Sequence, residues 1–218
     1  MTYTIELAAA DDAEGIARVM LNTTESEFSR LQRGTMGDED SQARMATRLQ
    51  SVIASPEQHV VVARVQETGE IASAAVWAIK EEEAVPSADE RARKIEERRQ
   101  AFDPRMNVEY IVELMQKLGD LEHSLVQGRK HWLLDNLATL PEHRRQGLAG
   151  KLVEWPLEMA DREGILCFLT TADGGGGESL YKKYGFERVG AAEFDLAKYG
   201  GSGPHTHIAM LREAKRNA

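Results

Sequence analysis

The sequence has very little cysteine. Its single thiol, Cys167, rules out a disulfide within the chain. Cys167 lies in the apolar run ILCFLTT, where we expect a buried core side chain and not a nucleophile. Because disulfides mainly stabilise secreted proteins, their absence favours a cytoplasmic protein, with a nuclear one as the alternative.

Long hydrophobic runs are also missing. No segment approaches the roughly 18 apolar residues that read as a membrane-spanning helix. The first residues, MTYTIELAAADD, lack the basic and apolar regions of a signal peptide. We therefore expect no membrane partner and a cytoplasmic location.

Basic residues are outnumbered by acidic ones. The chain has 27 Lys and Arg against 36 Asp and Glu, and its formal net charge is −9. Nucleic-acid binding usually needs a basic face, so nucleic acid is not an expected partner. An acidic surface gives a slight preference for cationic ligands through long-range attraction.

The hydrophobic pattern predicts a mixed α/β domain over residues 1–218. Apolar runs predict strands at residues 2–8, 59–65, 71–80, 131–140, 165–171, 186–192 and 205–211. Helices are predicted at residues 38–54, 145–164 and 179–185, and another should open near Asp11 with a capping box to Glu14. A hairpin at 59–80 requires antiparallel pairing, whereas strand–helix–strand units require parallel pairing. A mixed sheet of about seven strands, with helices on both faces, follows.

Residues 81–130 interrupt this alternation. The first part, EEEAVPSADERARKIEERRQ, is densely charged with both signs, which is typical of a solvated helix face. The second part repeats apolar residues at helical spacing, including Val108, Ile111, Met115 and Leu118. We interpret 81–130 as a helical insertion before the central strand.

The segment RRQGLAG, from Arg144 to Gly150, joins a predicted strand to a predicted helix. Its amides include those that are unsatisfied at a helix N-terminus, and Gly147 and Gly150 allow close approach of a ligand. Such a turn can bind an anion, although a plain basic helix start remains the alternative. The spacing matches neither a Walker A loop nor a dinucleotide-binding Gly-x-Gly-x-x-Gly.

Two motifs carry a family resemblance. Arg144-x-x-Gly147-x-Ala149 resembles the Arg/Gln-x-x-Gly-x-Gly/Ala signature of the GNAT acetyltransferase superfamily. LYKKYGF, at 180–186, resembles its Leu-Tyr-x-x-x-Gly-Phe signature. The order of elements is similar to the GNAT fold except for the insertion, and the layout resembles that of puromycin N-acetyltransferase-like members.

The resemblance implies acetyl-CoA as co-substrate and assigns its contacts. The loop would hold the pyrophosphate with Arg144, Arg145, Gln146, Gly147, Leu148, Ala149 and Gly150. The preceding strand would pair with the pantetheine arm through Leu137, Ala138 and Thr139. Family members often carry an asparagine at the end of the strand before the second motif. Here Thr170, Thr171 or Ser179 would have to replace it.

Acetyl transfer to an amine calls for an acid and a base. The resemblance implies that Tyr181 protonates the leaving thiolate. The candidate bases are Asp135 and Glu109, with a water chain as the alternative. Strict alternation along a strand would place Asp135 on one face with Leu133, Leu137 and Thr139.

His205 and His207 stand two residues apart on one face of the last predicted strand. Two imidazoles without a third ligand are weak evidence for zinc, so no metal is expected.

We expect an acetyl-CoA-dependent N-acetyltransferase that acts on a small-molecule primary amine by direct attack in a ternary complex. The alternatives are a protein or peptide acetyltransferase for lysine or N-terminal amines, and a non-catalytic CoA-binding sensor. The chain could act as a monomer or a homodimer.

Overall fold

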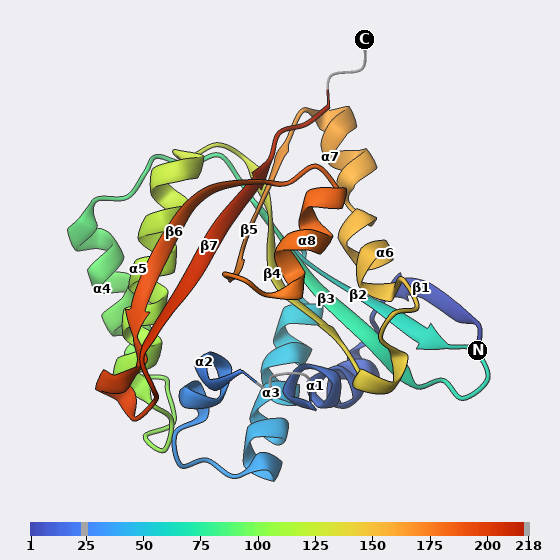
Figure 1. Cartoon of the computed structure of the whole chain (residues 1–218), viewed down its shortest axis with the longest axis horizontal. Helices are drawn as coiled ribbons and strands as arrows, with labels where there is room; N and C mark the ends of the chain where they lie inside the picture. Colours follow the sequence, from blue (N-terminus) through green and yellow to red (C-terminus); the bar gives the residue numbers. More distant parts are fainter. Residues whose placement is uncertain (23–25, 216–218) are drawn as a thin grey trace.

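The computed structural model describes residues 1–22 and 26–215 and confirms a mixed α/β fold. Seven strands form one sheet in the order β1-β2-β3-β4-β5-β7-β6 (Figure 1). The strands are β1 Tyr3–Leu7, β2 Gln58–Val65, β3 Ile71–Lys80, β4 His131–Thr139, β5 Leu166–Ala172, β6 Glu187–Asp195 and β7 Pro204–Arg212. Only β4 and β5 are parallel neighbours, and all other pairs are antiparallel.

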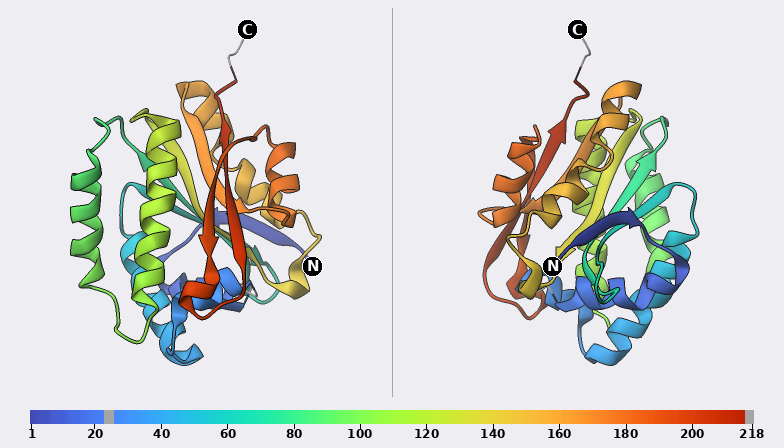
Figure 2. Two further views of the ribbon diagram at one scale, coloured as in Figure 1. Left: turned by 60° about the vertical axis from the view of Figure 1, so that its left-hand side comes forward. Right: turned by 90° about the vertical axis from the view of Figure 1, so that its right-hand side faces the viewer.

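Helices cover both faces of the sheet (Figure 2). The helices are α1 Ala13–Asn22, α2 Glu27–Arg30, α3 Asp38–Ile53, α4 Ala88–Arg99, α5 Val108–Val126, α6 Leu148–Glu154, α7 Leu157–Glu163 and α8 Gly176–Lys183. Buried clusters place α1, α3 and α5 on one face, and α6, α7 and α8 on the other. The helix predicted at 145–164 is divided at Pro156, as its missing backbone donor requires.

Strand β3 lies at the centre of this sandwich. Residues 71–78 are all buried, because α1 packs against one side of the strand and α6 against the other. A strand that is covered on both faces is expected to be a nearly continuous apolar run, and IASAAVWA is apolar except for Ser73.

The start of the first helix differs from the prediction. A 3₁₀ turn at Ala10–Asp12 precedes α1, and the Ala9 N–H donates to Asp12 Oδ2 at 2.9 Å. The expected Asp11–Glu14 capping box is therefore wrong. The Arg64 guanidinium also donates to both Asp12 oxygens, at 2.9 and 2.8 Å, which fixes this carboxylate one residue away from the predicted cap.

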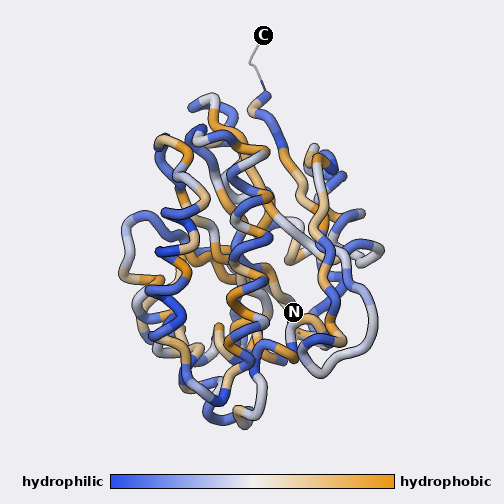
Figure 3. The backbone as a smooth tube through the Cα atoms, turned by 90° about the vertical axis from the view of Figure 1, so that its left-hand side faces the viewer, coloured by the Kyte–Doolittle hydropathy of each residue, from blue (hydrophilic) through white to orange (hydrophobic). Residues whose placement is uncertain are grey.

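The insertion folds as two helices of different character. Helix α4 has no buried residue, whereas α5 buries Tyr110, Ile111 and Val126 and packs on β5 and β6. Hydrophilic and hydrophobic residues alternate along the helices on this side of the molecule, as expected for helices with one buried face (Figure 3). None of the helices in the described ranges is long and apolar enough to cross a membrane.

Candidate active site

Strands β4 and β5 separate half-way along their length. They pair from His131 to Leu134 and from Leu166 to Leu169, and no farther. Beyond that point β5 pairs only with β7, and β4 pairs only with β3. On the side that faces β5, residues 136–139 of β4 therefore lack a strand partner among the described residues. Backbone groups on this edge are available to a ligand, although the Thr139 carbonyl also accepts from Arg144 Nε at 3.4 Å.

A β-bulge at Asp135 marks the start of this separation. Val76 pairs with Asn136 and Trp77 with Leu134, so Asp135 is the extra residue on β4. The bulge changes which residues share a face. Leu134 and Leu137 both pack on the α6–α7 side.

The bulge corrects the predicted environment of Asp135. Leu133 packs with α5 and Leu137 on the opposite face, so the expected common face for Leu133, Asp135, Leu137 and Thr139 is wrong. The Asp135 carboxylate instead accepts from Arg48 of α3 at 3.4 Å and from the Asn136 amide at 3.0 Å. Its side chain is 42% exposed, so water reaches the carboxylate.

The loop that follows β4 has the backbone of an anion site. Arg145 has φ 62° and Gly147 has φ 77°, so two residues of this short turn are left-handed. A non-glycine residue in this region stores strain, which is common at ligand-binding turns. Residues 144–147 are exposed, and nothing lies within 4 Å of a Cβ built on Gly147.

Helix α6 begins directly after this turn at Leu148, with Gly147 as its N-cap. The first intrahelical bond runs from the Lys151 N–H to the Gly147 carbonyl at 3.2 Å. The N–H groups of Leu148, Ala149 and Gly150 precede it and have no acceptor within the helix. This geometry suits a phosphate group.

Helix α8 closes the other side of the separated strands. The predicted start of this helix at residue 179 is wrong, because α8 begins at Gly176. A Cβ on Gly177 would lie 2.8 Å from Thr171 Oγ1 and 3.2 Å from the Tyr181 ring. Glycine thus lets α8 approach the end of β5, where Thr171 is half-buried, whereas Ser179 on α8 is exposed.

Tyr181 belongs to α8, and its side chain is buried on the α6–α8 side of the sheet. Its ring packs edge-to-face on Phe186 at 6.0 Å. Burial raises the pKa of Tyr181 to about 12, so the hydroxyl keeps its proton at neutral pH. A protonated phenol is suited to donate to a leaving group.

Tyr184 connects the two ligand-facing helices and was not singled out from the sequence. A Cβ on Gly150 would collide with its hydroxyl. Glycine at 150 therefore lets α8 lie directly against the start of α6. Sequence reasoning identified Gly150 but not its contact with Tyr184, because this contact depends on how two separate helices pack against each other.

Glu109 has a different setting from Asp135. It stands in the first turn of α5, is 63% exposed and forms an ion pair with Arg99 of α4. Its carboxylate is thus bonded to the outer helix of the insertion.

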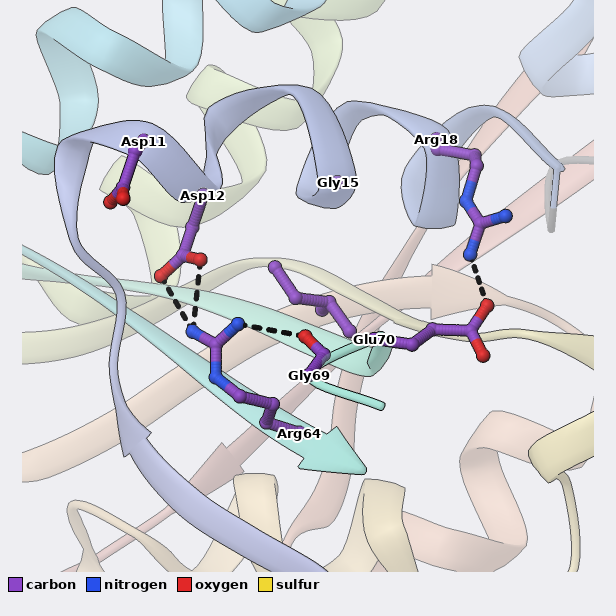
Figure 4. A pocket seen from close by; sticks show the side chains of 8 residues that line it. Asp11, Asp12, Gly15, Arg18, Arg64, Gly69 and Glu70 are labelled. Carbon is purple, nitrogen blue, oxygen red and sulfur yellow. Dashed lines mark hydrogen bonds and ion pairs between the residues drawn. The ribbon is translucent and has the colours of Figure 1, made fainter. Parts of the chain in front are cut away.

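A hollow of about 320 Å³ lies elsewhere, between α1 and the β2–β3 turn. Figure 4 shows two ion pairs in its lining, Arg64 with Asp12 and Arg18 with Glu70, whereas Asp11 is not paired with any residue drawn. These pairs tie the start of α1 to the hairpin. We therefore assign the hollow a structural role and place the candidate active site at the separated strands.

One group beside this hollow has the composition of a metal site. Atoms of Glu70, Glu142 and His143 lie within 4.8 Å of one another. His143 Nδ1 already bonds the Tyr3 hydroxyl at 3.0 Å, and Glu70 pairs with Arg18. The absence of a metal stays a prediction.

Comparison with known proteins agrees with this geometry. Residues 110–188 match the family model of the acetyltransferase (GNAT) domain, which includes β4, the loop after it and α8. No curated protein matches the sequence significantly.

Solved structures of GNAT enzymes share the fold over nearly the whole chain. Arylalkylamine N-acetyltransferase 2 from Aedes aegypti has a TM-score of 0.69 at 14% identity, covering 99% of this chain and 100% of that chain. The polyamine N-acetyltransferase of Drosophila melanogaster has a TM-score of 0.65 at 14% identity, covering 97% and 100%. A histone acetyltransferase HPA2 and related acetyltransferase from Corynebacterium glutamicum has a TM-score of 0.60 at 19% identity, covering 100% of both chains.

The chain therefore shares its fold with solved N-acetyltransferase structures. More specifically, residues 110–188, which include β4, the following turn and α8, match the acetyltransferase (GNAT) domain.

Proposed function

We propose that this protein transfers the acetyl group of acetyl-CoA to the primary amine of a small molecule, by direct attack in a ternary complex. The proposal depends chiefly on one observation, the unpaired edge of β4 that leads into the left-handed turn and the start of α6. An extended amide-containing arm would pair with Leu137, Ala138 and Thr139. The pyrophosphate would then reach residues 144–150.

The residues present fit coenzyme A. The N-terminal amides of α6 would donate to pyrophosphate oxygens, and Gly147 places no side chain in their way. The exposed guanidinium groups of Arg144 and Arg145 would add charge-assisted contacts. When bound, acetyl-CoA supplies an already activated thioester.

Deprotonation of the acceptor is the difficult part of the reaction. An alkyl ammonium with a pKa near 10.4 lies about 3.4 units above neutrality, which corresponds to roughly 4.6 kcal/mol at pH 7. Asp135 stands at the opening between β4 and β5 and is our first candidate base. Glu109 is the second, and its use would require its ion pair with Arg99 to open.

Tyr181 would act as the acid. Its buried hydroxyl lies on the face of the sheet that carries α6 and α8, the same face as the proposed phosphate-binding turn. The phenol would give its proton to the departing sulfur. A free amide on the open edge of β4 would polarise the thioester carbonyl.

A small amine as the acceptor substrate is consistent with the names of the similar solved structures. Two of the structures above are described as acting on arylalkylamines and polyamines. In this chain, α2 and the tip of the β6–β7 hairpin meet over the α5 face, where Ser202 donates to Glu27 at 2.9 Å. This contact would narrow the path of an acceptor amine toward the separated strands on the side of the sheet opposite Tyr181.

Calorimetric titration with acetyl-CoA tests the binding step. Gly147→Glu places a carboxylate where the pyrophosphate would lie, and we expect it to abolish binding. Gly164→Glu is the matched control, since Gly164 also has a positive φ, 70°, and open space for a side chain, but it follows α7. Equal binding by wild type and both variants, or no binding by wild type, would refute the proposal.

A thiol-release assay then tests the acceptor. We expect turnover with at least one of agmatine, spermidine, tryptamine and phenethylamine, and none with lysine-containing or N-terminal peptides. Turnover with peptides alone would assign a protein acetyltransferase instead. Tight acetyl-CoA binding without any turnover would favour a CoA-binding sensor.

A further inference from the structure

Two histidines on β7 form a hydrogen-bonded pair that the reaction described above does not use. His205 Nε2 and His207 Nδ1 lie 2.9 Å apart. The ring of Phe28, on α2, stacks against both imidazoles with centroid distances of 4.2 Å. The stack fixes the orientation of both rings and keeps their nitrogens in line.

The pair lies beside the separated strands, on the face opposite Tyr181. His207 is the partner of Ala172, the last residue of β5, and of Ala192 on β6. Ala172 is three residues beyond Leu169, where the pairing with β4 stops, which is about 10 Å along a strand. An amine between β4 and β5, with one or two water molecules, spans that distance.

Burial disfavours the charged form of both rings. Burial, with a smaller effect of His205, lowers the pKa of His207 to about 4, and burial also lowers the pKa of His205. The charged groups on the elements around the pair include Glu27 and Arg30 on α2, Asp173 after β5, Glu193 and Asp195 on β6, and Glu113 and Lys117 on α5. None of these groups, all in the described part of the chain, bonds to either imidazole.

Most of these charges are held elsewhere. Glu27 accepts from Ser202, Asp173 pairs with Arg188, and Lys117 pairs with Glu113. His207 Nε2 has no hydrogen-bond partner within the described ranges and is not sealed from solvent. A neutral imidazole with an open nitrogen can accept a proton.

We propose that His207 and His205 form a proton relay that carries the proton of the acceptor ammonium to solvent. The inference rests on the proposed function, because it takes the space between β4 and β5 as the place of acetyl transfer. It gives the proton a route to solvent that does not involve Asp135 or Glu109.

The protons balance as follows. His207 Nε2 accepts a proton from the ammonium through water, His207 Nδ1–H passes its proton to His205 Nε2, and His205 Nδ1–H releases one to solvent. Proton exchange of the rings with water between turnovers restores the starting tautomers. The amine lone pair then forms the C–N bond while the C–S bond breaks. Tyr181 protonates the sulfur, and the second nitrogen proton, lost as the amide forms, replaces the proton of Tyr181.

Phenylalanine variants separate a relay from simple packing, because Phe keeps the stack with Phe28 but cannot carry a proton. With the first amine of the panel that turns over, we expect His207→Phe to lower kcat/KM about 100-fold at pH 7. The deficit should shrink steadily as the pH rises and vanish near the pKa of the amine, where the substrate is already neutral. His205→Phe should show the same trend with a smaller loss.

His59→Phe is the matched control. His59 is also partly buried and burial lowers its pKa, but it packs on Trp132 and Trp155 on the other face of the sheet. We expect its kcat/KM and pH profile to equal those of wild type. A wild-type profile in His207→Phe would overturn the relay.

Two readouts do not depend on turnover. Acetyl-CoA should bind both β7 variants as it binds wild type, and loss of binding would assign the histidines a structural role and overturn the relay. Imidazole nitrogen NMR of the whole protein should show both rings neutral at pH 6, and a charged ring at that pH would also overturn it. Failure of wild type to bind acetyl-CoA would instead refute the proposed function.

Discussion

Asp135 shows how far a single residue can be placed from sequence. The carboxylate was expected on the central strand, and β4 carries it there. The bulge that inserts Asp135 opposite β3 could not be predicted, because it depends on the register of two strands separated by residues 81–130. The predicted face was therefore wrong, although the position along the strand was right.

A single substitution at Tyr181 tests its proposed role as the proton donor. We expect Tyr181→Phe to lower kcat about 100-fold while acetyl-CoA binds unchanged, because the ring is kept and only the proton donor is lost. Since the pKa of Tyr181 is raised to about 12, its ionisation should produce no fall in wild-type kcat between pH 6 and 9. Steady-state thiol release and calorimetry measure the two effects.

Tyr184→Phe serves as the control for this tyrosine. Tyr184 touches the start of α6 from the same helix, so its loss should leave kcat within about twofold and change mainly the affinity for acetyl-CoA. Full kcat in Tyr181→Phe would show that Tyr181 only packs beneath the ligand.

At the scale of elements, helix type and order were predictable and helix boundaries were less so. Glycine has a poor intrinsic helix propensity, so the helix was predicted to begin only at residue 179, after Gly176 and Gly177. In the structure α8 includes both glycines. The helix packs so closely on Thr171 and Tyr181 that there is no room for a side chain at Gly177. Tertiary packing decided this boundary, and no local pattern contains that information.

The contact between α7 and β7 gives a prediction on stability. Arg212 donates to both oxygens of Asp161 at 2.7 Å, and the guanidinium side chain is only 3% exposed. We expect Asp161→Asn to lower the free energy of unfolding by about 3 kcal/mol, because it leaves a buried charge without its partner. Urea denaturation measures the loss.

The control for this pair is Asp173→Asn, whose partner Arg188 is 43% exposed and which should cost under about 1 kcal/mol. The hydrogen bonds from Arg212 hold the pKa of Asp161 below its ordinary value. The stability that Asp161 contributes is therefore complete above about pH 4 and is lost as the pH falls through the lower folded-state pKa. Equal losses in the two variants would contradict this account.

At the scale of the whole molecule, the mixed sheet and the helical insertion were predictable from patterning. The order β5-β7-β6 was not, since nothing in a single strand says that the last strand inserts between two earlier ones. That residues 1–218 act as one acetyltransferase domain remains our prediction.

Replacement of α4 tests how the insertion is divided. We expect substitution of residues 88–99 by eight Gly and Ser residues to leave acetyl-CoA binding intact and to lower Tm by only a few degrees, because α4 buries no residue. Eight extended residues reach about 26 Å, enough to span the removed helix. Circular dichroism and calorimetry give the two values.

Tyr110→Ala is the contrasting variant, because Tyr110 is fully buried and its hydroxyl donates to the Phe28 carbonyl at 3.0 Å. Its loss should cost about 3 to 5 kcal/mol, as for other large-to-small core changes. If α4 replacement proved as damaging as Tyr110→Ala, the two helices would have to be regarded as one unit.

The pairing of β3 with β4 also has a consequence for the rate of folding. These central strands pair along most of their length, although the whole insertion lies between them in the chain. Closing a loop costs conformational entropy, by only about 0.6 kcal/mol for each doubling of its length, but that cost precedes any gain from strand pairing. Helix α5 spans part of this loop and shortens the effective chain that must close. We therefore expect substitutions that weaken α5 to slow refolding more than they speed unfolding, in stopped-flow measurements across urea concentration.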